Sequence, residues 1–239
     1  MKRILITNDD GIASSGILRL AEAARAFGEA VVVAPATERS ALAHSITVRE
    51  PVDLVPYDFP VPGVTAWACT GTPSDCVRIS LSWLLPEPPD LVLSGINNGW
   101  NIATDIQYSA TVGAALEAAH DGIPAIAFSE PYNGDHSVTD RYLSRILSDL
   151  MEARPGRDAI LNVNFPSGPC SGILTGRTVS FGSMHRTHYR LSEKQPDGTL
   201  RLAAYSVPDE TCEEGTDFRA ILGRYISIGI VRNVGSAEG

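Results

Sequence analysis

The stretch Ile4-Leu5-Ile6-Thr7-Asn8-Asp9-Asp10-Gly11 decides the fold class of this 239-residue chain. Residues 2–7 contain a short apolar run without polar alternation, which is typical of a parallel strand buried on both faces. Residues 15–27 then place apolar side chains at helical spacing, and Gly28 follows as a stop signal. A second apolar run at residues 30–34 ends at Pro35. The order strand, helix, strand predicts a β-α-β unit.

The same alternation continues through most of the chain. Further strands are predicted at residues 90–94, 125–129 and 159–165, and helices at residues 72–85, 111–120 and 138–151. Residues 45–70 interrupt the pattern, because scattered valines are mixed with prolines, and we interpret them as an irregular β excursion. The alternation predicts an α/β fold with a doubly wound, Rossmann-like and mostly parallel sheet.

The pattern changes after Pro166. Residues 172–181, 200–207 and 225–231 are predicted as strands of a less regular region, with a turn at Pro196-Asp197-Gly198 and a short helix capped by Thr216-Asp217. We therefore divide the chain into an α/β core at residues 1–170, which contains the expected site, and an irregular, β-rich C-terminal extension at residues 171–239. We expect this extension to pack on a second subunit.

The overall charge argues against some classes of partner. The chain has 19 basic and 28 acidic residues, and its net charge is -9. A protein that binds a nucleic acid polymer would show a basic surplus or a dense basic run, and neither is present. No apolar run is long enough to cross a bilayer, and the apolar stretch before Asn8 is too short for a signal peptide. We expect a cytoplasmic protein that acts on a small molecule.

Three polar segments follow predicted strands: Asn8-Asp9-Asp10-Gly11, Thr37-Glu38-Arg39-Ser40 and Gly95-Ile96-Asn97-Asn98-Gly99. Because ligands bind at the carboxyl ends of parallel strands, we expect these segments to share one edge of the sheet. Their carboxylates, hydroxyls and carboxamides suit a hard cation such as Mg²⁺ or Mn²⁺, and adjacent carboxylates repel each other unless a cation lies between them. A solvated turn that caps the next helix is the alternative interpretation of the first segment. The convergence of three segments favours a metal site.

A fourth segment, Tyr108-Ser109-Ala110-Thr111-Val112, leads into the helix predicted at residues 111–120. Free backbone N–H groups at a helix start, with two hydroxyls beside them, favour a phosphate-binding site, although simple capping by Ser109 or Thr111 is the alternative. The sequence contains no dinucleotide fingerprint, no P-loop and no Gly-x-Ser-x-Gly motif. A phosphatase with an aspartyl nucleophile of the haloacid dehalogenase type would need Asp-x-Asp, whereas Asp9 and Asp10 are adjacent.

Together these segments resemble the SurE family of survival-protein nucleotidases. The resemblance spans nearly the whole chain, because further family segments occur in the expected order. They are Ala34-Pro35-Ala36-Thr37-Glu38-Arg39-Ser40, Gly71-Thr72-Pro73-Ser74-Asp75, Ser94-Gly95-Ile96-Asn97-Asn98-Gly99-Trp100-Asn101, Asn162-Val163-Asn164-Phe165-Pro166 and Thr216-Asp217.

The resemblance implies a function and a site. Asp9, Asp10, Ser40 and Asn97 would hold one divalent metal ion per subunit, Mg²⁺ or Mn²⁺, and Asp9 and Asp10 would be the catalytic residues. The resemblance implies that the protein is a metal-dependent phosphomonoesterase, which converts 5′- or 3′-nucleoside monophosphates into nucleoside and phosphate. The family also forms dimers or tetramers through a C-terminal arm, which implies a homodimer or homotetramer here.

The candidate phosphate- and substrate-binding residues are Asn8, Gly95, Asn101, Ser109, Ala110 and Thr111. His44 is a candidate general acid, although a histidine beside a short strand more often has a structural role. Ala103 and Ala110 depart from the family pattern, which usually has glycine at both positions. These departures keep open a dedicated phosphatase for a phosphorylated sugar or a natural-product intermediate. A non-catalytic nucleotide- or phosphate-binding protein is a further alternative.

Overall fold

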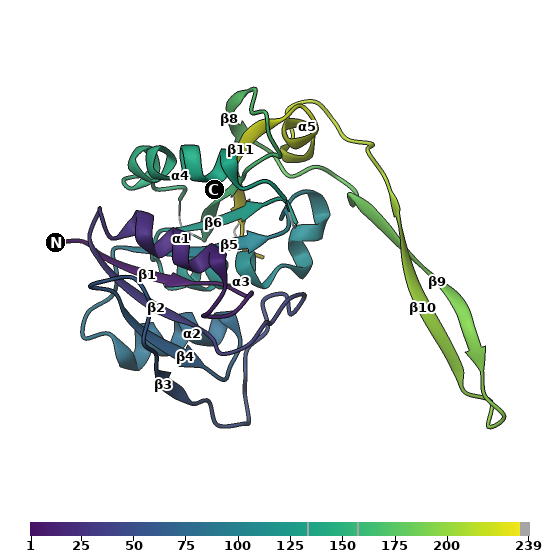
Figure 1. The fold of residues 1–239 in the computed structure, drawn as a ribbon, viewed down its shortest axis with the longest axis horizontal. Helices are drawn as coiled ribbons and strands as arrows, with labels where there is room; N and C mark the ends of the chain where they lie inside the picture. Colours follow the sequence, from purple (N-terminus) through teal and green to yellow (C-terminus); the bar gives the residue numbers. More distant parts are fainter. Residues whose placement is uncertain (133, 157, 235–239) are drawn as a thin grey trace.

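A computed structural model describes residues 1–132, 134–156 and 158–234. Within these residues the main sheet has nine strands in the order β3-β4-β2-β1-β5-β6-β7-β11-β8 (Figure 1). Its strands are β1 (Arg3–Thr7), β2 (Glu29–Pro35), β3 (Leu54–Pro56), β4 (Thr65–Cys69), β5 (Leu91–Asn98), β6 (Ala125–Glu130), β7 (Ala159–Asn164), β8 (Gly172–Arg177) and β11 (Tyr225–Arg232). Strands β4, β2, β1, β5, β6 and β7 are parallel, which confirms the predicted fold class.

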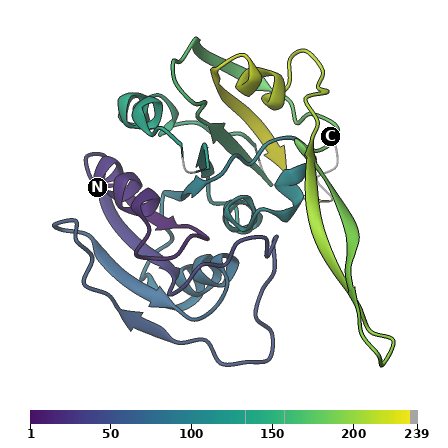
Figure 2. The same ribbon diagram turned by 45° about the vertical axis from the view of Figure 1, so that its right-hand side comes forward.

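Helices cover both faces of the sheet. They are α1 (Ser15–Ala24), α2 (Pro73–Ile79), α3 (Ala110–His120), α4 (Ser137–Leu150) and α5 (Asp217–Leu222). One buried apolar cluster contains the inner faces of α1 and α4, and a second contains those of α2 and α3. Figure 2 shows α1 and α4 side by side on one face. Ile4 and Ile6 of β1 belong to the first cluster and Leu5 to the second, so the strand is apolar throughout because both of its faces are covered.

The irregular excursion predicted at residues 45–70 ends in a regular strand. Strand β4 pairs in parallel with β2, and β3 pairs with β4 in the antiparallel direction. The helix predicted at residues 72–85 is shorter than expected, because α2 ends at Ile79 and a π-helical turn, Ser80–Leu84, follows it. Capping at the start of α2 is as predicted, since the Thr72 side chain accepts a hydrogen bond from the Asp75 backbone N–H.

The C-terminal region divides into two parts. Strands β8 and β11 extend the main sheet, and α5 packs beside them. Strands β9 (His185–Lys194) and β10 (Leu200–Pro208) instead form an antiparallel hairpin that projects from the body (Figure 1). Every residue of β9 is exposed. The predicted turn at Pro196-Asp197-Gly198 joins the two strands, and Gly198 has a φ of +89°, which favours glycine.

Parallel strands place their carboxyl ends along one edge of the sheet. Strands β1, β2 and β5 therefore deliver the segments after Thr7, Pro35 and Ser94 to the same edge. In the part of the chain that the structure describes, no helix combines the length and the apolar character needed to cross a membrane.

Candidate metal centre

The Asn8-Asp9-Asp10-Gly11 turn follows directly from the carboxyl end of β1. The Asn8 side chain shapes this turn, because its Nδ2 donates to the Gly11 carbonyl at 3.0 Å and to Ser14 Oγ at 2.8 Å. Gly11 has a φ of +98°, and a Cβ there would lie 3.3 Å from the Thr37 carbonyl carbon, so glycine allows the second loop to approach. The turn thus presents two consecutive carboxylates at a tightly packed edge.

Three distant segments make direct hydrogen bonds to this pair of aspartates. The Arg39 N–H donates to the Asp9 carbonyl at 2.7 Å, which places Ser40 one residue away. The Asn98 N–H donates to Asp10 Oδ2 at 3.0 Å, which places Asn97 one residue away. The Thr111 hydroxyl donates to Asp9 Oδ1. The segments that follow β1 and β2, the end of β5 and the start of α3 therefore meet at one place.

Burial and charge make the two aspartates an energetically unfavourable pair without a cation. Asp9 is 3% exposed, and burial raises its pKa to about 6, with Asp10 adding to the rise and the Thr111 hydroxyl opposing it. Burial also raises the pKa of Asp10, and the nearby charges of Glu38 and Glu130 act in the same direction. A bound cation would remove both penalties.

The other two expected ligands provide the neutral oxygens. Asn97 Nδ2 donates to the Gly99 carbonyl at 2.8 Å, which orients the carboxamide and leaves Oδ1 as its acceptor. The Ser40 hydroxyl is exposed and donates to Glu38 Oε1 at 2.8 Å. No group of three or more His, Cys, Asp or Glu side chains in the described ranges is arranged to hold a metal ion. A metal at this place therefore depends on the oxygens of Ser40 and Asn97 as well. Such an all-oxygen set fits Mg²⁺ or Mn²⁺.

The expected phosphate cradle lies at the N-terminus of α3, next to Asp9. Ser109 is the N-cap, and its Oγ accepts a hydrogen bond from the Val112 N–H at 3.1 Å. Ala110 is the first residue of α3 and does not have a positive φ, so its methyl group, which is fully buried, introduces no left-handed strain. Ala103 does adopt a left-handed conformation, with a φ of +53°, and its N–H donates to Asp217 Oδ2 at 3.0 Å. This backbone conformation favours glycine, which explains why the family pattern usually has glycine at the position of Ala103.

Gly95 and Asn101 lie on either side of the Asn97 turn. A Cβ on Gly95 would lie 2.3 Å from the Phe128 carbonyl oxygen, and its φ is +131°, so the site requires glycine. The Asn101 N–H donates to Asn164 Oδ1 at 2.9 Å, and its Nδ2 donates to Ser129 Oγ at 2.8 Å. These bonds tie the turn to β6 and β7. A phosphate contact by Asn101 remains a prediction.

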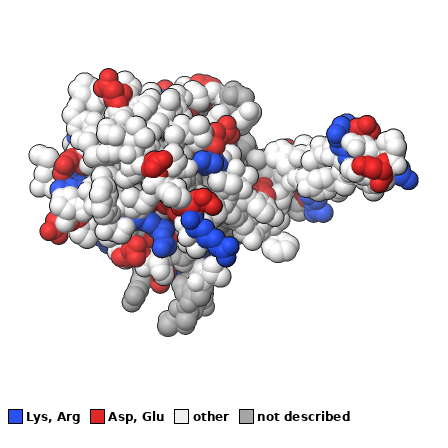
Figure 3. All heavy atoms as spheres, turned by 90° about the horizontal axis from the view of Figure 1, so that it is seen from below, with Lys and Arg blue, Asp and Glu red and all other residues white. Residues whose placement is uncertain are grey.

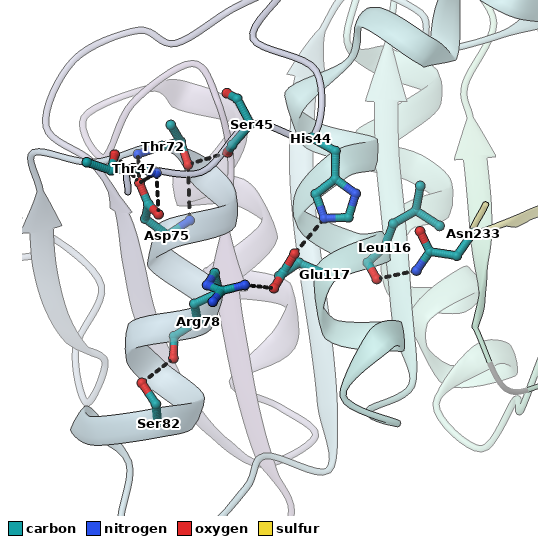
Figure 4. A network of polar contacts seen from close by, with 10 residues as sticks. All are labelled: His44, Ser45, Thr47, Thr72, Asp75, Arg78, Ser82, Leu116, Glu117 and Asn233. Carbon is teal, nitrogen blue, oxygen red and sulfur yellow. Dashed lines mark hydrogen bonds and ion pairs between the residues drawn. The ribbon is translucent and has the colours of Figure 1, made fainter. Parts of the chain in front are cut away.

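His44 lies on the loop between β2 and β3 and pairs with a carboxylate of α3 (Figure 4). Its Nε2 is 2.6 Å from Glu117 Oε2, and Arg78 of α2 donates to Glu117 Oε1 at 3.0 Å. The hydrogen bond from His44, helped by the charge of Arg78, lowers the pKa of Glu117. Glu117 follows Thr111 by six residues, which is about 9 Å along the helix. His44 is thus engaged away from the end of α3 that contacts Asp9.

Two buried carboxylates hold the loop that carries Ser40. Asp75 accepts hydrogen bonds from the Thr47 hydroxyl at 2.6 Å and from the Thr47 N–H, while Glu117 holds His44. A Cβ on Gly113 would lie 2.7 Å from the Ala43 carbonyl oxygen, so the loop lies directly against α3. Sequence patterns give no signal for these contacts, because a lone acidic residue in a helix usually faces solvent.

We expect the His44→Ala variant to keep the shape of the pH–rate profile and to lose about tenfold in kcat, the lower end of the range that is usual for a residue that acts through others. The physical reason is that His44 donates to Glu117 and holds the loop. The measurement is kcat/KM against pH for both proteins. Glu117→Gln, which keeps a hydrogen-bonding partner for His44, serves as the matched control. Loss of one limb of the profile in His44→Ala alone would instead make His44 the general acid.

Known proteins resemble this chain over nearly its whole length. Residues 4–190 match the family model described as Survival protein SurE. A Thermosynechococcus vestitus protein named 5'-nucleotidase SurE is 42% identical over 236 residues, with 95% of this chain and 89% of that protein covered. A protein of the same name from Heliobacterium modesticaldum is 40% identical, with coverages of 95% and 84%. The crystal structure of a SurE protein from Aquifex aeolicus superposes with a TM-score of 0.81 at 34% identity, covering 98% of this chain and 95% of that one.

Proposed function

This chain belongs to the survival protein SurE family, and from that premise we propose that it hydrolyses nucleoside monophosphates to nucleoside and phosphate. One observation carries the proposal: the loop after β2, the end of β5 and the start of α3 all bond directly to Asp9 or Asp10. That arrangement builds an acidic, oxygen-lined site from segments that lie far apart in the sequence. The names of the relatives, 5'-nucleotidase SurE, support the same substrate class.

We propose that Asp9, Asp10, Ser40 and Asn97 hold one Mg²⁺ or Mn²⁺ ion per subunit. When bound, the ion polarises a phosphate oxygen and offsets negative charge in the transition state. Asn97 is prepared for this role because its amide nitrogen is already held by the Gly99 carbonyl. The Ser40 hydroxyl donates its hydrogen to Glu38, which leaves the lone pairs of its oxygen for the metal.

The protein's own groups would orient the substrate and the attacking water. Thr111 holds Asp9 Oδ1 in place, which leaves Oδ2 to orient the water. The positive end of the α3 dipole, next to Ser109 and Ala110, is placed to bind phosphate oxygens. Asn8 contributes by holding the turn rather than by an exposed group, since its side chain is fully buried.

A phosphate-release panel tests the proposed activity. The substrates are 5′- and 3′-nucleoside monophosphates, a sugar phosphate and p-nitrophenyl phosphate, each with Mn²⁺ and with an excess of chelator. We expect release from the nucleotides with Mn²⁺ and a loss of activity with chelator, because two carboxylates without a cation repel the substrate phosphate. Preference for the sugar phosphate would point to a dedicated phosphatase. Nucleotide binding without any phosphate release would point to a binding protein.

We also propose that the chain forms a homodimer or homotetramer through the β9–β10 hairpin. The hairpin is exposed on both sides and has large apolar side chains along it, including Tyr189, Leu191 and Leu202. Leu191 and Leu202 are cross-strand partners, so they lie on the same face. On the face seen in Figure 3, charged side chains gather near the far end of the hairpin. Apolar surface of this kind is typical of an interface with another copy.

The variant Leu191→Asp/Leu202→Asp is expected to shift the protein from an oligomer to a monomer, because two charges would be buried in the proposed interface. Light scattering after size-exclusion chromatography measures the mass. Glu193→Gln near the tip, which removes a charge from an exposed ion pair with Arg201, should leave the mass unchanged. A wild-type protein that is already monomeric at micromolar concentration would contradict the proposal.

A further inference from the structure

A pocket of about 290 Å³ opens beside Asp10, on the side of the sheet covered by α1 and α4. Its lining includes Asp10, Ser14 at the start of α1, Asn98 at the end of β5, Glu130 at the end of β6 and His136 just before α4. The volume lies just below the usual range of about 300–1,000 Å³ for small-molecule sites, so the pocket suits part of a substrate. The pocket shares Asp10 with the proposed metal site, so a ligand in it would adjoin the reacting phosphate.

Two polar atoms in this pocket have no hydrogen-bonding partner within the described residues. Glu130 is only 2% exposed, and its Oε1 accepts from Arg19. Its Oε2 lies 3.0 Å from His136 Nδ1, yet the two atoms are not oriented for a hydrogen bond to each other. Both atoms are buried, and each can still form a hydrogen bond with a group that enters the pocket. A ligand hydroxyl beside this pair would supply the hydrogen bonds that the two atoms lack.

The charges of the pocket restrict what that ligand is. Asp10 and Glu130 are carboxylates, and the guanidinium of Arg19 is already shared between Glu130 and Asp140. A phosphate group would be repelled, and it has a better site at the start of α3. A neutral group with hydroxyls fits, because an alcohol can donate to Glu130 Oε2 and bond to His136 Nδ1 at the same time.

We propose that this pocket binds the sugar hydroxyls of the substrate, and that Glu130 and His136 are the residues that select a hydroxylated leaving group. The inference rests on the proposed phosphatase function and deepens it, since it names the part of the substrate that this chain recognises. The phosphate would lie at the metal site and the sugar would extend past Asp10 into the pocket. Glu130 Oε2 would accept from one hydroxyl, and His136 would bond to that hydroxyl or its neighbour.

The test compares AMP, its 2′,3′-dideoxy analogue and p-nitrophenyl phosphate in the wild type, Glu130→Gln and His136→Ala. We expect both variants to raise KM for AMP by about tenfold or more, with kcat changed less than about threefold, because the lost bonds hold the ground state and transition state equally. For p-nitrophenyl phosphate, kcat/KM measured at saturating Mn²⁺ should stay within about twofold, because saturation with the cation removes the influence that the Glu130 charge has on metal binding near Asp10. Dideoxy-AMP should have a raised KM in the wild type and no further rise in either variant, as a double-mutant cycle requires.

Asp140→Asn is the matched control. Asp140 accepts from the same Arg19 at 2.8 Å but is exposed and does not line the pocket, so this variant should behave as the wild type. If Glu130→Gln fails to fold, His136→Ala still tests the proposal, because the His136 side chain is 40% exposed and its removal should not disturb the fold. Equal losses on AMP and on p-nitrophenyl phosphate would overturn the proposal and leave Glu130 a structural residue.

The failure of the proposed function is distinguishable from the failure of this inference. Metal-dependent hydrolysis of p-nitrophenyl phosphate, with AMP kinetics unaffected in both variants, refutes the sugar pocket and keeps the phosphatase. If the wild type hydrolyses no ester, calorimetric titration with AMP and with inorganic phosphate still decides the matter. The pocket then stands if the variants lose affinity for AMP alone, and it is refuted if they do not.

Discussion

The Asp9→Asn variant is expected to lower kcat/KM for nucleoside monophosphates by at least about a thousandfold, which corresponds to about 4 kcal/mol of transition-state stabilisation. Asp9 is the aspartate to which both the loop that carries Ser40 and the start of α3 bond. Asparagine keeps the Oδ1 acceptor for the Thr111 hydroxyl but removes the charge that a divalent cation needs. Phosphate release with saturating Mn²⁺ measures the loss, and calorimetric titration with Mn²⁺ separates lost metal binding from lost chemistry.

The same variant lowers activity but is expected to stabilise the metal-free protein. The pKa of Asp9 in the folded, metal-free protein is raised to about 6 from an ordinary 3.8, so the folded state favours the protonated form. Protonated Asp9 therefore stabilises the folded, metal-free protein fully below about pH 4, and this stabilisation is lost as the pH rises through about 6. With chelator at neutral pH, Asp9→Asn should melt at a higher temperature than the wild type. Near-normal turnover, or a strongly lowered melting temperature, would contradict the role given to Asp9.

The Gly16→Ala variant should have the second-largest effect. A Cβ on Gly16 would lie 2.1 Å from the Ile96 carbonyl oxygen, and both groups belong to packed backbone. Relief requires α1 to move away from the end of β5, and this movement separates the turn with Asp10 from Asn97. We expect a destabilisation of about 3 kcal/mol, the upper end of the usual range for overpacking. The affinity for Mn²⁺ should fall at least about tenfold, since displaced metal ligands act at that scale.

Urea unfolding and Mn²⁺ titration measure the two effects of Gly16→Ala separately. Gly63→Ala is the control, because a Cβ on Gly63 has no atom within 4 Å. Its φ of +81° makes the alanine unfavourable by about 1 kcal/mol without any clash, and Mn²⁺ affinity should not change. A Gly16→Ala protein that binds Mn²⁺ as tightly as the wild type would show that the contact between α1 and β5 does not set the geometry of the site.

The regular elements of the core were predictable because each is buried in a characteristic way. Strands β1, β5, β6 and β7 are short apolar runs, and α4 has an apolar stripe, so local pattern and final burial agree. Strand β9 escaped prediction for the opposite reason. Its sequence, residues 185–194, is mostly polar and charged, and all of it is exposed, so no burial pattern marks it. The pairing of β4 with β2 is a long-range contact that the scattered valines do not encode locally.

Sequence by itself determined the α/β class, the order of the core strands and helices, the family and the segments that hold the candidate ligands. Those properties follow from local periodicity and from short motifs, which need no knowledge of distant contacts. Only the tertiary structure decided that Thr111 holds Asp9, that His44 is paired with Glu117, and that Glu130 faces a pocket beside Asp10. The sequence alone does not distinguish a buried carboxylate from a solvated one, because the pKa and the partners of a carboxylate are set by neighbours from other parts of the chain.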